Sequence, residues 1–214
     1  IQGRSDDTLV STGSNTTVSS LTDVVFDTAT KIGTLTYSGN EITLSGSTSF
    51  VHSINGSEYF QNSGTQTLEC VAQKTGTSAW IVFGLAVNKV TSSSDHSADL
   101  EYGIKSADDG RTWYKQSSGG WTQASNTSDN VTFKIVNDRQ GTVTYYADGS
   151  SIGSTTHGTP AAAYYSQATV AQTGTAGSYT FDYTGDVRIS TLAHPNLTNG
   201  AIFEESDGTG KHYM

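Results

Sequence analysis

The segment FKIVNDRQGTVTYYADGSSIGS, residues 133–154, indicates the fold class more clearly than any other part of the chain. Apolar residues recur at every second position, first over residues 131–135 and again over residues 143–147. This spacing places them on one face of a β-sheet. Asp138-Arg139-Gln140-Gly141 has the composition of a four-residue turn, and Asp148-Gly149 is a second turn signal. The segment therefore predicts two strands and the start of a third, joined by two tight turns.

Other short apolar runs continue this pattern. Strands are expected within residues 24–26, 35–37, 41–44, 49–54, 59–60, 67–73, 80–87, 100–104, 111–114, 161–170 and 178–190. The run WIVFGLAV, residues 80–87, is nearly continuous rather than alternating, which predicts a central strand covered on both faces. Asn55-Gly56 predicts a hairpin turn. Many short strands without an amphipathic helix or a repeat of fixed period predict an all-β antiparallel sandwich or jelly roll.

Composition and charge exclude several classes of partner. The formal net charge is −9, which argues against nucleic acids and anionic membrane surfaces as partners. No run of about 18 apolar residues exists, so no membrane insertion is expected.

The single cysteine, Cys70, excludes an intrachain disulfide framework. It lies in phase with Leu68 and Ala72, which predicts a buried core thiol rather than a nucleophile.

Changes in residue composition along the chain predict three parts. Residues 1–22 are polar and rich in Ser and Thr, and they predict an arm or linker. Residues 23–192 hold the strand pattern and predict one β-sandwich recognition domain. Residues 193–214 differ in composition and predict a C-terminal extension. Because the chain begins without Met and without a signal peptide, we expect it to be a piece of a longer protein.

Five blocks in this order resemble the concanavalin A-like jelly rolls, the group of lectin, laminin G-like and SPRY-like sandwiches. The blocks are WIVFGLAV (80–87), LEYGI (100–104), SDNVTFKI (128–135), GTVTYYADGSSIG (141–153) and SYTFDYTGDVRIS (178–190). The resemblance covers roughly residues 24 to 192. It implies the fold first and glycan binding second, because this fold also hosts hydrolases, lyases and interaction modules.

The resemblance raises the question of catalysis and metal binding. Glucanases of this fold carry carboxylates at positions i, i+2 and i+4 of one strand, and Asp99 and Glu101 supply only two of the three. Asp182 and Asp186 stand at positions i and i+4, but Gly185 is expected to bend the strand between them. The GxSxG elbow of a serine nucleophile is absent from the sequence. We therefore predict that the chain is not an enzyme and requires no cofactor. Relatives of this fold bind Ca²⁺ through loop carboxylates, which makes Asp95 and Asp99 candidate ligands; plain turn residues are the alternative.

Aromatic residues give the strongest functional signal. Sugar rings stack on aromatic faces while polar neighbours orient their hydroxyls, so convergent aromatic and polar groups predict a binding site. A core role is the alternative for each tryptophan, and Trp80 is expected in the core. Of Tyr145 and Tyr146, which point to opposite faces, one is expected to face outward. The candidate ligand-binding residues are Asp109, Arg111, Trp113, Tyr114, Trp121 and Tyr146.

These observations lead to a functional expectation. We expect a carbohydrate-recognition domain that binds a surface glycan, located extracellularly, on a cell surface or on a virion. Phage tail fibres and bacterial adhesins carry head domains of this kind, and by analogy with them a homotrimer is expected. A structural module that binds protein partners is the alternative, followed by a glycan hydrolase or lyase.

Overall fold

The structure is a computed structural model that describes residues 15–44, 52–61, 64–74, 80–89, 100–107, 109–116, 119–156, 163–171, 177–188, 203–204 and 212–213. Residues Asn15–Arg188 form one compact unit, which contains strands β1 to β14. A second unit comprises residues 1–14 and 189–214; its described part is a two-stranded antiparallel ladder of β15 (Phe203–Glu204) and β16 (His212–Tyr213).

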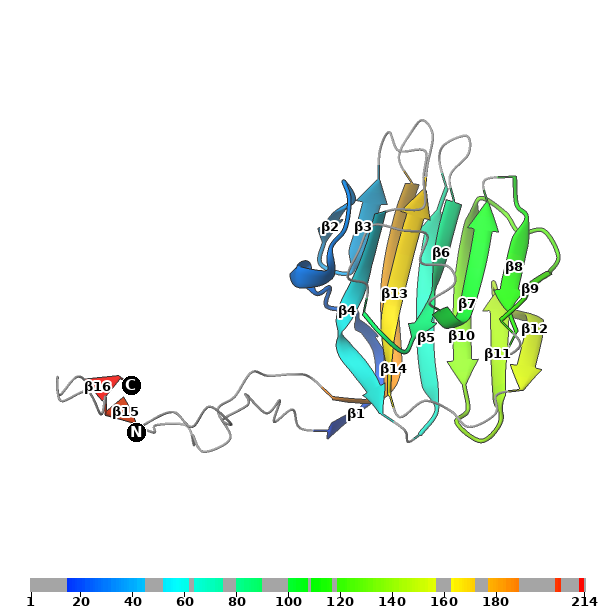
Figure 1. The fold of residues 1–214 in the computed structure, drawn as a ribbon. Coiled ribbons are helices and arrows are strands. Elements are labelled where there is room, and N and C mark those ends of the chain that lie inside the picture. The colour runs from blue at the N-terminus through cyan, green and yellow to red at the C-terminus, as the bar shows by residue number, and fades with distance from the viewer. Residues whose placement is uncertain are drawn as a thin grey trace. The chain divides into compact units, whose positions relative to one another are not determined.

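The larger unit is a β-sandwich of two antiparallel sheets (Figure 1). The β10 sheet has the order β12-β11-β10-β5-β14, and β1 and β3 pair with β14 while β2 pairs with β3. The β6 sheet has the order β4-β13-β6-β7-β8-β9. The two sheets meet at β14 and β4, which pair through only two residue pairs, Val187 with Phe60 and Arg188 with Tyr59. The predicted all-β sandwich is confirmed.

The strands have the following bounds. In the β10 sheet they are β1 (Asn15–Asp23), β2 (Thr36–Ser38), β3 (Glu41–Leu44), β5 (Gln66–Gln73), β10 (Asn130–Asn137), β11 (Thr142–Ala147), β12 (Ser150–Thr156) and β14 (Gly177–Arg188). In the β6 sheet they are β4 (His52–Gln61), β6 (Trp80–Ala86), β7 (Leu100–Ala107), β8 (Thr112–Lys115), β9 (Trp121–Gln123) and β13 (Ala163–Ala171). A 3-10 turn, η1 (Thr28–Thr30), precedes β2.

Both turns of the opening segment form where the sequence predicts them. Asp138 Oδ1 accepts backbone N–H bonds from residues 140, 141 and 142, at 2.8, 3.1 and 2.9 Å, and so closes the β10–β11 turn. Asp148 and Gly149 have φ angles of 48° and 77°. Positive φ at both central residues is what a two-residue hairpin with right-handed twist requires. Asp and Gly therefore suit this turn for a steric reason.

Alternating side chains from both sheets form one core. Every second residue of β5, β10 and β11 is buried, and the intervening residues are partly exposed. Phe83 of β6 joins the layers, because its ring centroid lies 6.2 Å from that of Phe133 and 5.7 Å from that of Phe181. Cys70 is completely buried among these side chains, as predicted, and burial raises the pKa of its thiol well above the ordinary value.

The prediction of a hairpin at Asn55-Gly56 is wrong, because both residues lie inside β4. The register between β4 and β13 shifts at this point, since Tyr165 pairs with Tyr59 but Gln167 pairs with Asn55. The buried Asn55 side chain donates to the backbone oxygen of Ser166 at 3.1 Å. The local turn preference of Asn-Gly is thus overridden by an irregularity within a continuous strand.

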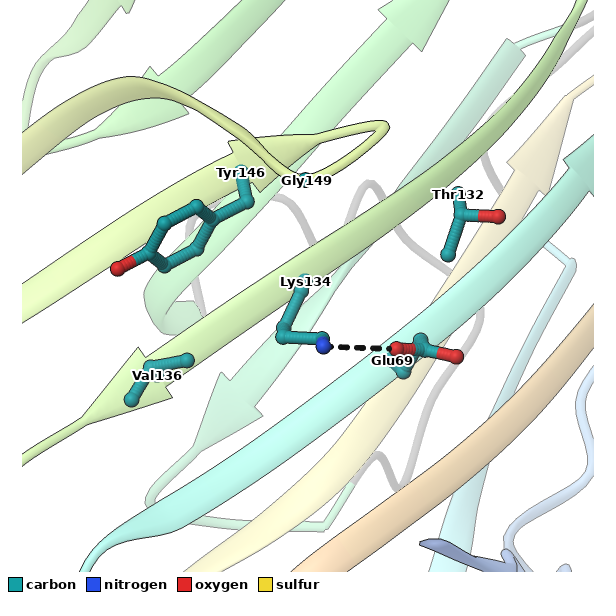
Figure 2. Close-up of a pocket in the computed structure, with 6 residues that line it drawn as sticks. All are labelled: Glu69, Thr132, Lys134, Val136, Tyr146 and Gly149. Carbon is teal, nitrogen blue, oxygen red and sulfur yellow. Dashed lines mark ion pairs between the residues drawn. The ribbon is translucent and has the colours of Figure 1, made fainter.

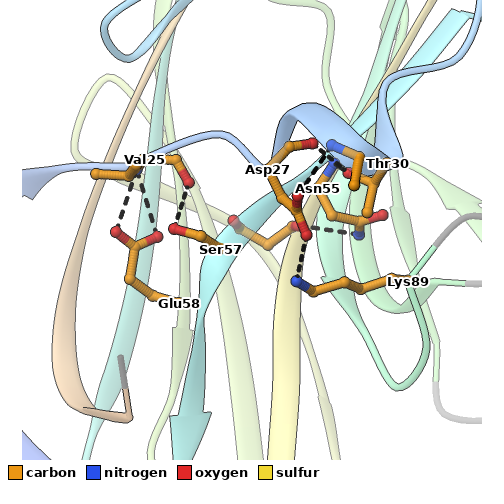
Figure 3. Close-up of polar contacts among 9 residues, drawn as sticks. Val25, Asp27, Thr30, Asn55, Ser57, Glu58 and Lys89 are labelled. Atoms are coloured by element: carbon orange, nitrogen blue, oxygen red, sulfur yellow. Dashed lines mark hydrogen bonds and ion pairs between the residues drawn. The ribbon is translucent and has the colours of Figure 1, made fainter. Parts of the chain in front are cut away.

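The segment before β2 is fixed to the β6 sheet by polar contacts (Figure 3). Both carboxylate oxygens of Glu58 accept from the backbone N–H of Val25 at 3.3 Å, and burial raises the pKa of Glu58. Lys89 donates to Asp27 at 2.7 Å, and Asn55 N–H donates to the Thr30 hydroxyl at 3.0 Å.

The predicted polar arm differs from the structure in its second half. Residues 15–22 belong to β1, which pairs with β14 in the compact unit. Thr and Val are favourable strand residues, and pairing with a strand edge satisfies their backbone groups without a strong apolar pattern. The Ser/Thr-rich sequence of β1 lacks apolar alternation, so local pattern alone does not predict this strand.

Candidate ligand-binding surface

Strand β8 sends its two aromatic residues to opposite faces of the β6 sheet. Tyr114 points between the sheets, where its ring stacks on Tyr145 at 5.2 Å between centroids and packs against Gly153. Tyr145 in turn donates its hydroxyl to the backbone oxygen of Lys115 at 2.6 Å. Trp113, one residue earlier, lies on the outer face. The structure therefore brings Trp113 to a surface but does not place Tyr114 beside it.

Trp113 stacks on Trp80, contrary to the expectation that Trp80 belongs to the core. The two indole rings lie 5.7 Å apart between centroids and within 15° of parallel. Trp80 is the first residue of β6 and is partly exposed, whereas the inward residues that follow it, Ile81 and Phe83, are completely buried. The first residue of the apolar run is thus a surface tryptophan. The nearly continuous hydrophobicity of residues 80–87 gave no indication of this exposure.

Two cationic side chains lie over both indole rings. Lys105 pairs with Trp113 in the register between β7 and β8, and its Nζ is 4.9 Å from the centroid of Trp80 and 5.6 Å from that of Trp113. The guanidinium of Arg111 lies 5.7 and 5.5 Å from the same two centroids. Cations at these distances are attracted to the ring faces. Sequence reasoning missed Lys105: the alternation of LEYGIKS places it on the face opposite to Tyr102 and Ile104, but its pairing with Trp113 depends on the register between β7 and β8.

Asp109 orients Arg111. Its Oδ2 accepts from Arg111 Nε at 2.5 Å, and its Oδ1 accepts from the Arg111 backbone N–H at 3.1 Å. These bonds, the backbone one first, hold the pKa of Asp109 below its ordinary value. The carboxylate therefore stays charged at neutral pH. Asp109 and Arg111 thus lie together beside the tryptophan pair, and their role in ligand binding stays a prediction.

Trp121 covers the neighbouring part of the same face. Its position on β9 is opposite Lys115, diagonal to Trp113, which corresponds to roughly 7–8 Å between Cα atoms. The Trp121 ring packs on a small cluster of Val82, Ala86 and Leu100. Lys115 is almost fully buried; its ammonium lies 6.0 Å from the Trp121 centroid and donates to the Leu100 backbone oxygen. We call the surface formed by Trp80, Lys105, Arg111, Trp113 and Trp121 the tryptophan surface.

Tyr146 lies elsewhere, on the outer face of the β10 sheet. It follows the buried Tyr145, so its ring points away from the core, and it lines a pocket with Lys134 and Glu69 (Figure 2). The structure therefore separates Tyr146 from the other predicted ligand-binding residues. Sequence alternation established that one of the two tyrosines faces outward, but it did not show which sheet would receive β11.

The metal and catalytic candidates are only partly covered by the structure. Asp95 and Asp99 lie outside the described residues, so the prediction of a Ca²⁺ site stays a prediction. Among the residues that are described, no cluster of three His, Cys, Asp or Glu side chains could hold a metal ion. Glu101 is skipped in the register between β6 and β7, where Ala86 pairs with Leu100 and Leu85 with Tyr102. Glu101 therefore lies at a β-bulge, and the i, i+2 placement of its side chain beside that of Asp99 stays untested because Asp99 lies outside the described residues.

Comparison with known proteins reveals the fold alone. No protein-family model matches this sequence, and no curated protein sequence is significantly similar to it. Among solved structures, the carbohydrate recognition domain of Emp47p superposes with a TM-score of 0.54 at 12% identity, covering 79% of this chain and 97% of that one. The PSpry domain of TRIM65 gives 0.53 at 12% identity, covering 75% and 90%. Stonustoxin gives a TM-score of 0.55 at 10% identity, and the match covers 74% of this chain but 28% of the stonustoxin chain.

These likenesses agree with the resemblance drawn from the sequence blocks. The chain has a concanavalin A-like, SPRY-like β-sandwich fold. No helix in the described part of the chain is long and apolar enough to span a membrane.

Proposed function

We propose that this chain is a non-catalytic recognition domain that binds surface carbohydrate through the tryptophan surface. The observation that carries the proposal is the parallel stack of Trp80 and Trp113 on an outer sheet face, with Lys105 and Arg111 over both rings. Partly exposed aromatic rings can stack against the C–H groups of a sugar. The two cations provide hydrogen-bond donors for hydroxyl or carboxylate oxygens.

Preorganisation supports a binding role. Asp109 fixes Arg111 through two hydrogen bonds, and stacking fixes Trp113 against Trp80. Side chains that are already held in one conformation lose less entropy when a ligand binds. We place the domain at the head of an extracellular fibre, spike or adhesin, where such a surface would contact a cell.

A glycan array tests the proposal. The wild-type chain is expected to retain a defined set of glycans, and Trp113→Ala is expected to lose them because the stacking surface is removed. Val25→Ala is the matched control, since Val25 is an exposed apolar residue outside this surface. An array without any bound glycan, or a Trp113→Ala variant that binds as the wild type does, would contradict the proposal.

A protein partner is the second candidate function. Trp and Arg are the residues most enriched at the energetic centres of protein interfaces, and this surface combines both types. Absence of glycan binding together with a stable oligomer in light scattering would favour this structural role. A homotrimer, as expected by analogy with fibre heads, is the oligomer to look for.

A further inference from the structure

The outer face of the β10 sheet carries a pocket that the tryptophan surface does not use. It has a volume of about 290 Å³ and lies over strands β5, β10 and β11 (Figure 2). Its walls are polar, aromatic and aliphatic, and they are formed by Glu69, Thr132, Lys134, Val136, Tyr146 and Gly149.

Strand register assembles this pocket. Glu69 of β5 pairs directly with Lys134 of β10, and Lys134 pairs directly with Tyr146 of β11. The neighbours of these residues along each strand, Cys70, Phe133 and Tyr145, are completely buried, so the three pocket residues all point outward. The pocket therefore stands on three central strands that a shared core holds in place.

An ion pair and an aromatic ring define the chemistry of the pocket. Lys134 Nζ lies 3.1 Å from Glu69 Oε2, and the Glu69 side chain is only 13% exposed. The Tyr146 ring leans toward Val136 and adds an apolar wall (Figure 2). A hydrogen-bond donor and an acceptor thus lie side by side in the same pocket as an aromatic ring.

Charge selects against ionic ligands. An anion would meet Glu69, and next to it Asp182, which pairs with Glu69 from β14. A cation would meet Lys134. Either ligand would also compete with the existing ion pair, whereas hydroxyl groups can donate to the carboxylate and accept from the ammonium while the pair stays in place.

Size restricts the ligand further. Pockets for drug-sized ligands span roughly 300–1,000 Å³, so this pocket is just below the lower limit of that range. A single polyhydroxylated ring has suitable dimensions, with one apolar C–H face to lie on Tyr146 and hydroxyls at its edge.

We propose that this pocket is a second ligand site, which binds one neutral sugar ring. The site stacks the ring on Tyr146 and holds its hydroxyl groups with Lys134 and Glu69. It lies on the sheet opposite to the tryptophan surface and does not depend on the function proposed for that surface. A domain with both sites would engage carbohydrate on two faces.

Amide chemical-shift titration with single sugars tests the proposal. Glucose, galactose, mannose and N-acetylglucosamine serve as neutral probes, while glucuronic acid and glucosamine serve as charged ones. We expect saturable shifts of the Lys134, Tyr146 and Gly149 amides with at least one neutral sugar. The charged analogues should bind more weakly than their neutral counterparts.

Variants separate stacking from nonspecific effects. Tyr146→Ala should weaken this binding about tenfold, and Tyr146→Phe should retain it, because the ring rather than the hydroxyl provides the stacking face. Thr144→Ala is the matched control on the same strand and face, outside the pocket. Trp113→Ala should leave binding at the pocket unchanged, which keeps the test distinct from that of the tryptophan surface.

Three results would overturn the proposal. They are the absence of saturable shifts with every neutral sugar, stronger binding of a charged analogue, and equal affinity of Tyr146→Ala and the wild type. Comparison of the amide spectra of each variant shows whether it is folded, and Tyr146→Phe provides the answer if Tyr146→Ala does not fold.

Discussion

On the outer face of the β6 sheet, Lys105 and Arg111 lie over two stacked tryptophans, whereas carboxylates line up on the outer face of the β10 sheet. There Asp23 pairs with Asp182, and Asp182 pairs with Glu69, across β1, β14 and β5. Lys134 at the end of this row pairs with Glu69. One sandwich therefore presents a cationic, aromatic surface on one side and a mainly acidic one on the other.

The overall charge of this molecule is a poor guide to the charge of a local surface. A net charge of −9 argues against anionic partners for the molecule as a whole. The tryptophan surface nevertheless has two cations over its rings, and Arg111 pairs with Asp109. The sign of the local charge on the tryptophan surface is therefore opposite to that of the molecule as a whole.

Removing the residue that joins the two layers should have the largest effect on both faces. Phe83→Ala deletes a fully buried ring between Phe133 and Phe181 and should destabilise the fold by about 3–5 kcal/mol. Chemical denaturation measures this loss. Val87→Ala is the control, since this residue is 40% exposed and its truncation should change stability by less than about 0.5 kcal/mol. Equal stability of Phe83→Ala and the control would show that the layers do not depend on this contact.

A methyl group at Gly103 should disturb the tryptophan surface alone. A Cβ there would lie 2.8 Å from Leu100 Cδ1, 3.0 Å from the Phe83 oxygen and 3.3 Å from Trp121 Cη2. Gly103→Ala should therefore cost about 1–3 kcal/mol through overpacking. In nitrogen–proton spectra the Trp121 indole signal should shift, and the amides of Lys134 and Tyr146 should not. An unmoved Trp121 signal would contradict the packing described for β9.

Coupling between Trp80 and Trp113 should be smaller but specific. A double-mutant cycle with Trp80→Ala and Trp113→Ala should give a stacking energy of about 0.5–1.5 kcal/mol in the free energy of unfolding. A parallel cycle that combines Trp80→Ala with Tyr146→Phe should be additive within about 0.5 kcal/mol, because these residues lie on different sheets. Additivity in the first cycle would mean that the two rings do not stabilise each other.

The smallest effect concerns the acidic row and depends on pH. Burial, with Asp23 and Glu69 adding to it, raises the pKa of Asp182 above its ordinary 3.8, although Asn40 opposes the shift by donating to the carboxylate at 2.9 Å. Between the ordinary pKa and the raised one, Asp182 therefore keeps its proton in the native state, whereas the unfolded chain has already released it. Stability falls as pH rises from the ordinary pKa to the raised one.

Asp182→Asn should remove this fall. The variant should be more stable than the wild type at pH 7, by less than about 1 kcal/mol after solvent screening, and the difference should shrink below pH 4. Thermal unfolding across this pH range measures it. Asp109→Asn is the contrasting control, because the pKa of Asp109 is lowered and its loss should not stabilise the protein at neutral pH. A pH-independent difference for Asp182→Asn would contradict the assignment.

Local patterns predicted much of the sandwich. Alternation over residues 131–147 and the Asp and Gly residues of the two turns were sufficient for β10, β11 and β12, since period and turn sterics act within a few residues. The prediction failed at Asn55-Gly56, where a tertiary contact to Ser166 competes with the turn preference. Local patterns also failed to predict β1. Its Ser/Thr-rich sequence forms a strand because its backbone pairs with β14.

The candidate site was predicted in its parts but not in its assembly. Asp109, Arg111, Trp113 and Trp121 lie close together in the sequence, and short hairpins keep them close in space. Trp80 and Lys105 join them from β6 and β7, while Tyr114 and Tyr146 are sent to the core and to the other sheet.

Local sequence patterns were enough for β10, β11 and β12, for the two turns between them and for the alternation of faces along these strands, because these features depend on the two-residue period of the backbone. The order of the strands, and hence which outward side chains meet, could not be predicted from local patterns. That order depends on packing between distant segments, such as Phe83 against Phe133 and Phe181, which no local pattern encodes. The same packing separates the tryptophan surface from the pocket at Tyr146.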